Sequence, residues 1–148
     1  MSYQEKIPNK SSIAGLRIYR SSVELEDSVH DLIASLPEDQ RYSLANDLRR
    51  SSTAISHNLH DGYRRHSYRL KLESIHLARL EAERLKNQLS GYQKLGYGDT
   101  ESLRQQCLGI ISQAWALIRH YKNRRDQQQS AVRINAADAL LAARGYPG

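Results

Sequence analysis

Residues 103–121, LRQQCLGIISQAWALIRHY, carry the clearest structural pattern in the chain. Apolar side chains recur there at alternating intervals of three and four residues, at Leu103, Cys107, Ile110, Ala114, Leu117 and Tyr121. This spacing draws one apolar stripe along an α-helix, because about 3.6 residues make a turn. The stretch therefore predicts a long amphipathic helix, and either Asp99 or Thr100 is expected to cap its start.

Two more helices are predicted upstream, the first from a similar apolar stripe and the second from its start and end signals. Residues 12–35 show the spacing of three and four, and they predict a first helix. Pro37 begins the second, since proline lacks the N–H that a first turn leaves unbonded and two carboxylates follow it. This helix is expected to run to Asp61 and to end at Gly62, because glycine enters the left-handed cap conformation without steric cost.

A third helix is predicted between Ser67, its expected N-cap, and the glycines Gly96 and Gly98. Four helices with short connections predict an all-α fold, an antiparallel up-down-up-down four-helix bundle. We expect the bundle to occupy residues 12–128, after a flexible N-terminus at residues 1–11. Residues 129–148 are predicted to form a C-terminal tail that is either frayed or a short helix.

Length and composition limit the cellular setting. The chain has 148 residues, enough for one domain, and one cysteine, so no intramolecular disulfide can form. Cys107 falls in an apolar stripe and is expected to be an inert core thiol. The sequence shows neither a signal peptide nor an apolar run of membrane-spanning length, and a cytoplasmic protein is predicted.

Two of the predicted helices carry more apolar surface than one bundle core requires. The additional positions are Leu77, Leu80, Ile111, Trp115 and Ile118. They form either a wide core stripe or a subunit interface, since large exposed apolar patches are uncommon on monomers. We take them as candidate residues of a homo-oligomer interface.

The basic residues form the second candidate surface. The net charge is +6, a mild excess that attracts phosphate-rich partners. The candidate contacts to RNA or DNA are Arg49, Arg50, Arg64, Arg65, Arg69, Arg119, Lys122, Arg124 and Arg125. In an up-down-up-down bundle they are expected to gather at one end, where phosphate contacts would be salt-dependent and blind to base sequence. Ordinary solvated charge is the alternative interpretation.

Metal sites were weighed and are not predicted. Asp27 with His30, and Glu73 with His76, have the carboxylate-x-x-His spacing of di-iron bundles, but the last helix lacks the inward carboxylates that such a site needs. A second group of candidate ligands, at the end of the second helix, consists of His57, His60 and Asp61. Three such residues at a helix end often occur by chance, and a solvated polar face explains this group better than zinc does, so neither a metal nor another cofactor is expected.

A ribonuclease is the enzymatic alternative. Six residues separate Arg50 from His57, and six separate Arg69 from His76, which resembles the Arg-x4–6-His motif of HEPN ribonucleases. In such a site the histidine would act as acid or base on a ribose hydroxyl while the arginine binds phosphate. The motif is short and arises easily by chance, so we expect no enzymatic activity.

One segment carries a family resemblance. Residues 35–65, SLPEDQRYSLANDLRRSSTAISHNLHDGYRR, resemble four-helix-bundle proteins encoded in intervening sequences of bacterial large-subunit rRNA genes. That family includes the accessory variability determinant proteins of diversity-generating retroelements. The matching positions are Pro37, Arg41, Tyr42, Leu44, Leu48, Arg49, Arg50, Ile55, Asn58, Leu59, Asp61 and Gly62.

The resemblance implies an antiparallel bundle that assembles into a ring-like homopentamer without enzymatic activity. For retroelement members it implies a basic surface that binds RNA or DNA and a partner reverse transcriptase. Only Arg49 and Arg50 match basic positions of the family segment. For the rRNA-insert branch, a structural oligomer with only a protein partner is the alternative.

Overall fold

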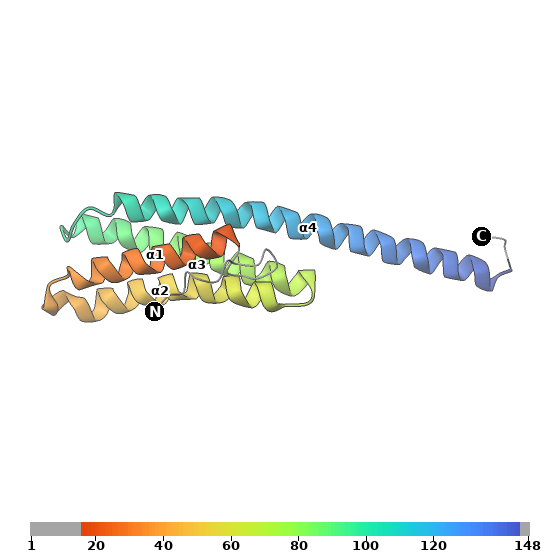
Figure 1. The fold of residues 1–148 in the computed structure, drawn as a ribbon, viewed down its shortest axis with the longest axis horizontal. Coiled ribbons are helices and arrows are strands. Elements are labelled where there is room, and N and C mark those ends of the chain that lie inside the picture. Colours follow the sequence, from red (N-terminus) through yellow and green to blue (C-terminus); the bar gives the residue numbers. More distant parts are fainter. Residues whose placement is uncertain (1–15, 146–148) are drawn as a thin grey trace, which may run out of the picture.

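The computed structural model describes residues 16–145, which form four helices joined by short connections. They are α1 (Arg17–Ala34), α2 (Glu38–Arg64), α3 (Tyr68–Lys94) and α4 (Glu101–Ala143). Each helix runs antiparallel to the one before it, and α1 also packs against α4, which closes the bundle (Figure 1). The predicted all-α four-helix bundle is thus confirmed.

The core consists of the predicted apolar stripes. Leu25, Ile55, Leu85 and Ile110, one from each helix, are completely buried. They belong to a continuous cluster that also includes Cys107. Burial of such side chains contributes roughly 1.5–3 kcal/mol each, which makes the interior the main source of stability.

Helix ends follow the sequence in most places. The Ser67 hydroxyl accepts a hydrogen bond from the Leu70 N–H at 3.2 Å, so the predicted N-cap of α3 is confirmed. The N-cap of α4 is Thr100, which makes no side-chain cap bond, and the carboxylate of the preceding Asp99 accepts from the Glu101 N–H at 2.9 Å. Thr100 is buried, and its hydroxyl donates instead to the Leu89 carbonyl at 2.9 Å.

Three boundaries differ from the prediction. α1 begins at Arg17 rather than at Ser12, and residues 12–15 lie outside the described part of the chain, as does the predicted flexible segment 1–11. α2 passes through Gly62 and ends at Arg64. A Cβ on Gly62 would lie 3.0 Å from Ile75 Cδ1 and 3.2 Å from Ser74 Cβ. This glycine therefore permits a close approach of α3 and is not a helix cap.

The third difference concerns the C-terminal tail. α4 is one helix from Glu101 to Ala143, so residues 129–143 continue it without a break. Figure 1 shows that α4 projects well beyond the turn between α2 and α3. The sequence reading of a separate short helix or a frayed tail did not anticipate this continuity.

Candidate nucleic-acid interface

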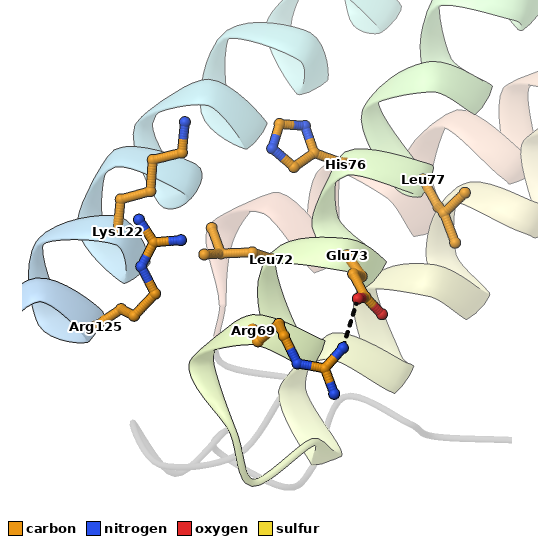
Figure 2. A pocket seen from close by; sticks show the side chains of 7 residues that line it. All are labelled: Arg69, Leu72, Glu73, His76, Leu77, Lys122 and Arg125. Atoms are coloured by element: carbon orange, nitrogen blue, oxygen red, sulfur yellow. Dashed lines mark hydrogen bonds and ion pairs between the residues drawn. The ribbon is translucent and has the colours of Figure 1, made fainter. Parts of the chain in front are cut away.

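A solvent-open cleft of about 560 Å³ lies at the end of the bundle where α2 turns into α3. Its lining from α3 is Arg69, Leu72, Glu73, His76 and Leu77, and its lining from α4 is Lys122 and Arg125. Figure 2 shows Leu72 and His76 pointing from α3 toward the two α4 cations, whereas Leu77 points away from them. Arg69, Leu72, Glu73 and His76 project from one side of α3, because residues three, four and seven positions apart in a helix point in nearby directions.

Cations outnumber carboxylates in this cleft. Arg69 pairs with Glu73 at 3.0 Å, and Arg125 lies 3.4 Å from the carboxylate of its neighbour Asp126. Among the side chains that the structure describes, at residues 16–37 and 43–145, Lys122 has no carboxylate within ion-pair distance. Its ammonium group is therefore the cation most available to an incoming anion.

The pKa of His76 reflects its burial and the charges around it. Burial lowers the pKa of its imidazole, and the nearby positive charges of Arg79 and Lys122 lower it further. The ring also packs edge-on against Trp115, with centroids 5.8 Å apart. Burial and the two neighbouring cations thus act in the same direction, and both disfavour a proton on the ring.

Aromatic rings adjoin the basic residues at this end of the bundle. Tyr68 and Tyr121 lie 6.1 Å apart between centroids, and Lys71 lies 5.7 Å from the centre of the Tyr121 ring. Lys71 also donates to the carbonyls of Gly62 and Tyr63, at 3.2 and 2.9 Å, and so neutralises the negative end of α2. Burial, together with the neighbouring tyrosines, raises the pKa of the Tyr121 hydroxyl.

The structure divides the predicted basic surface. Arg69, Lys122 and Arg125 share the cleft, and Arg64 and Arg65 lie exposed at the adjoining end of α2. Arg119 and Arg124 are exposed on α4, but they do not line the cleft. The gathering of all nine residues at one end was therefore predicted too broadly.

Arg49 and Arg50 account for most of that error. They lie near the middle of α2, about 20 Å along the helix axis from Arg64 at 1.5 Å per residue. There they line a separate shallow pocket of about 460 Å³, together with His57. The Arg50 and His57 pair of the ribonuclease alternative thus shares one exposed face, where His57 lies 3.5 Å from Asp61.

The predicted interface residues separate in a similar way. Leu77, Leu80 and Trp115 are exposed, and Ile111 is half-buried. Ile118 is only 1% exposed and belongs to the core, so its assignment to a surface was wrong. Its position next to the main stripe of α4 widens the core instead, because α3 covers that side of the helix.

The arrangement of side chains and helices also bears on metal binding and on membrane insertion. Among residues 16–37 and 43–145, whose side chains the structure describes, His, Cys, Asp and Glu do not come together in threes that could hold a metal ion. In the same part of the chain, the helices lack an apolar stretch sufficient to cross a bilayer.

Sequence reasoning missed the part of His76 in the cleft and the two tyrosines at the same end of the bundle. His76 was considered only as a metal ligand or as part of a ribonuclease motif, and Tyr68 and Tyr121 were not singled out as a surface feature. The usable signal was the recurrence of Arg69, Glu73 and His76 along one side of α3, next to a tyrosine at its first position.

Comparison with known proteins places the fold in a family. Residues 14–115, more than half of the chain, match the family described as 23S rRNA-intervening sequence protein. The fold is similar to the crystal structure of a protein of unknown function from the S23 ribosomal protein family of Bacteroides thetaiotaomicron, with a TM-score of 0.65 and 19% sequence identity. That alignment covers 69% of this chain and 95% of the other. No curated protein matches the chain significantly. On the strength of the match over residues 14–115, the chain belongs to the family of 23S rRNA-intervening sequence proteins.

Proposed function

We propose that this chain is a non-enzymatic, homo-oligomeric scaffold that binds the phosphate backbone of RNA or DNA in the cleft between α3 and α4. The observation that carries the proposal is the convergence of Arg69, Lys122 and Arg125 on one open cleft with a single carboxylate, Glu73. Phosphate groups are the common biological anions that such cations recognise without reading base sequence.

The chemistry of the cleft favours a polyanion over a single small anion. The cleft is open to solvent, and exposed basic residues, Arg64 and Arg65, continue the positive surface at the end of α2. A phosphate chain can contact several of these cations in succession, and each contact releases condensed counterions.

Tyr68 and Tyr121 supply a second element of such an interface. Bases of single-stranded nucleic acid stack on aromatic side chains, and cations beside the rings bind the connecting phosphates. Tyr121 is half-buried, and the Lys71 ammonium group lies 5.7 Å from the centre of its ring, so a cation accompanies the aromatic surface. Single-stranded RNA is therefore the first ligand to test.

The scaffold part of the proposal depends on exposed apolar side chains. Leu77 and Leu80 on α3 and Trp115 on α4 are large hydrophobic residues left at the surface of one chain. Covering them in a homo-oligomer would remove apolar area from water at roughly 25 cal/mol per Å². A ring of five copies is the assembly that we propose, and a reverse transcriptase is the protein partner proposed for a retroelement role.

Binding to a labelled single-stranded RNA at 50 and 200 mM salt tests the cleft. If three phosphate contacts are made, affinity should fall roughly twentyfold between these concentrations. Lys122→Glu combined with Arg125→Glu should abolish binding. The matched control, Arg49→Glu with Arg50→Glu, changes the charge equally outside the cleft and should weaken binding only slightly. If both variants lose RNA affinity equally, the interaction depends on the net charge of the protein and not on the cleft. Unchanged binding by the cleft variant would refute the proposal.

A ribonuclease is the second candidate, because the structure brings one of the two predicted pairs, Arg69 and His76, into the cleft beside Lys122. A neutral imidazole can accept a proton from a ribose hydroxyl, and the cations can hold the phosphate. Incubation of the protein with the same RNA decides between the two functions. Intact RNA agrees with a scaffold, whereas cleavage that His76→Ala abolishes would establish the enzyme.

A further inference from the structure

The second half of α4 lacks intramolecular cover. All residues from Asp126 to Gly145 are exposed, and the helix projects past the other three (Figure 1). Its helical part, residues 126–143, spans about 27 Å at 1.5 Å per residue. An isolated helix of this length is marginal in water, since most helical stability in proteins comes from packing. A partner that covers one face would supply the missing stabilisation.

The projecting segment has its own apolar stripe. Ser130, Ile134, Ala137 and Leu141 follow the alternation of four, three and four residues that two packed helices use. This stripe is not an extension of the bundle seam. If the seam from Leu103 to Tyr121 is continued, it falls mainly on polar side chains, which include Arg124, Gln128, Asn135 and Asp138. The stripe therefore faces a different direction from the core of its own bundle.

Charges flank the stripe in a self-complementary pattern. If Ile134 and Leu141 occupy the first position of a heptad, Ala137 occupies the fourth, Asp138 the fifth and Arg133 the seventh. In a parallel pair of helices, the seventh position of one strand lies beside the fifth position of the next heptad in its partner. Arg133 of each copy would then face Asp138 of the other, which gives two identical ion pairs.

We propose that the α4 extension, residues 126–143, forms a parallel two-stranded coiled coil with the same segment of a second copy of this chain. Ile134 places a β-branched side chain at the first heptad position, where two-stranded coiled coils carry this class of residue. Asp126 and Asp138 outweigh Arg133 within residues 126–143, so the segment has little attraction for a phosphate backbone. The extension lies beyond residues 14–115, which match the family, and the pairing is independent of the cleft and of the exposed α3 leucines.

Disulfide trapping in the full-length protein tests whether the partner is a second copy of this chain and whether the two helices run parallel. Ser130→Cys is nearly isosteric and places a thiol on the stripe, where parallel strands bring the two copies together. Antiparallel strands would place residue 130 opposite residue 141 and hold the thiols about 16 Å apart. Val132→Cys is the matched control, because its exposed side chain lies off the stripe. The native thiol gives little background, since Cys107 is completely buried.

Under mild oxidation, Ser130→Cys should form a covalent dimer in at least several-fold higher yield than Val132→Cys. The mass of the reduced protein should also fall at low concentration in Ile134→Ser but not in Val132→Ser, although the two native side chains are 61% and 62% exposed. Equal trapping by both cysteine variants, or an unchanged mass in Ile134→Ser, would overturn the proposal. Arg133→Asp should weaken association, and adding Asp138→Arg should restore it; if it does not, the strands are not parallel.

Discussion

The Arg79 guanidinium carbon lies 4.5 Å from the centroid of the Trp115 ring, which joins α3 to α4 on the outside of the bundle. Glu83 holds the same guanidinium at 3.1 Å, and Arg79 is largely covered. A cation over an indole contributes roughly 0.5–2 kcal/mol, with the higher values in desolvated settings. Trp115 is thus partly a structural residue, although 39% of it remains exposed.

Trp115 is both a packing partner of Arg79 and a candidate interface residue, so the oligomer interface is better tested at a position that does not hold the fold together. Leu80→Glu introduces a charge at an exposed position on α3 and leaves the Arg79–Trp115 contact in place. We expect it to lower the mass measured by light scattering toward that of two chains paired through the α4 extension, without loss of helicity, because a buried unpaired carboxylate is costly. Val23→Glu on α1, where the native side chain is 38% exposed, is the control and should keep the native mass. A native mass for Leu80→Glu would exclude this face of α3.

Two glycines should respond in opposite ways to a side chain. At Gly109 an added Cβ meets no atom within 4 Å, so Gly109→Ala should stabilise the fold by about 0.5–1 kcal/mol through its higher helix propensity. At Gly62 the added atoms meet Ile75 and Ser74, and Gly62→Val should cost roughly 1–3 kcal/mol through overpacking. Urea unfolding followed by circular dichroism measures both changes. Stabilisation by Gly62→Val would contradict the close approach of α2 and α3.

The difference between these glycines also shows what the sequence could predict. Periodicity specified three of the four helices because each stripe is local, Pro37 marked the start of α2, and Ser67 capped α3 as its residue type predicts. Gly62 was misread because a glycine near a helix end has the same sequence signal whether it caps the helix or admits a neighbouring one. Only the packing of α2 on α3 distinguishes the two.

The candidate site was less predictable for a related reason. His76 and Lys122 are far apart in sequence, and only the pairing of α3 with α4 brings them to one cleft. Charge counting grouped Arg49 with Arg64, because it ignores the length of helix between them. The straight continuation of α4 was likewise hidden, since residues 127–129, three glutamines, neither favour a break nor show a core pattern.

Thr100 offers a test of the α3–α4 connection. Its buried hydroxyl donates to the Leu89 carbonyl at 2.9 Å, and its N–H donates to Gln93 Oε1 at 3.0 Å. Thr100→Val keeps the shape but leaves the carbonyl without this donor, which should cost about 1–3 kcal/mol in the free energy of unfolding. Thr100→Ser keeps the hydroxyl and should lose less. A larger loss in the serine variant would assign the role of Thr100 to packing.

Cys107 predicts a pH dependence of stability. Burial raises the pKa of its thiol from 9.0 to about 12. Between these values the unfolded chain releases a proton that the folded chain retains, so rising pH favours unfolding. The contribution of this group is complete below pH 9 and declines by up to about 1.4 kcal/mol per pH unit above it.

Unfolding by urea at pH 8, 9.5 and 10.5 measures this decline, and Cys107→Val provides the reference. Tyr121 titrates in the same direction in both proteins, because burial also raises the pKa of its hydroxyl. The wild-type protein should therefore lose more stability than the variant between pH 9.5 and 10.5. In the same series, a thiol reagent at pH 8 should modify the native protein only at the rate of its unfolding, since the thiol is both covered and protonated. Parallel pH profiles for the two proteins would mean that the Cys107 thiol titrates as it does in the unfolded chain.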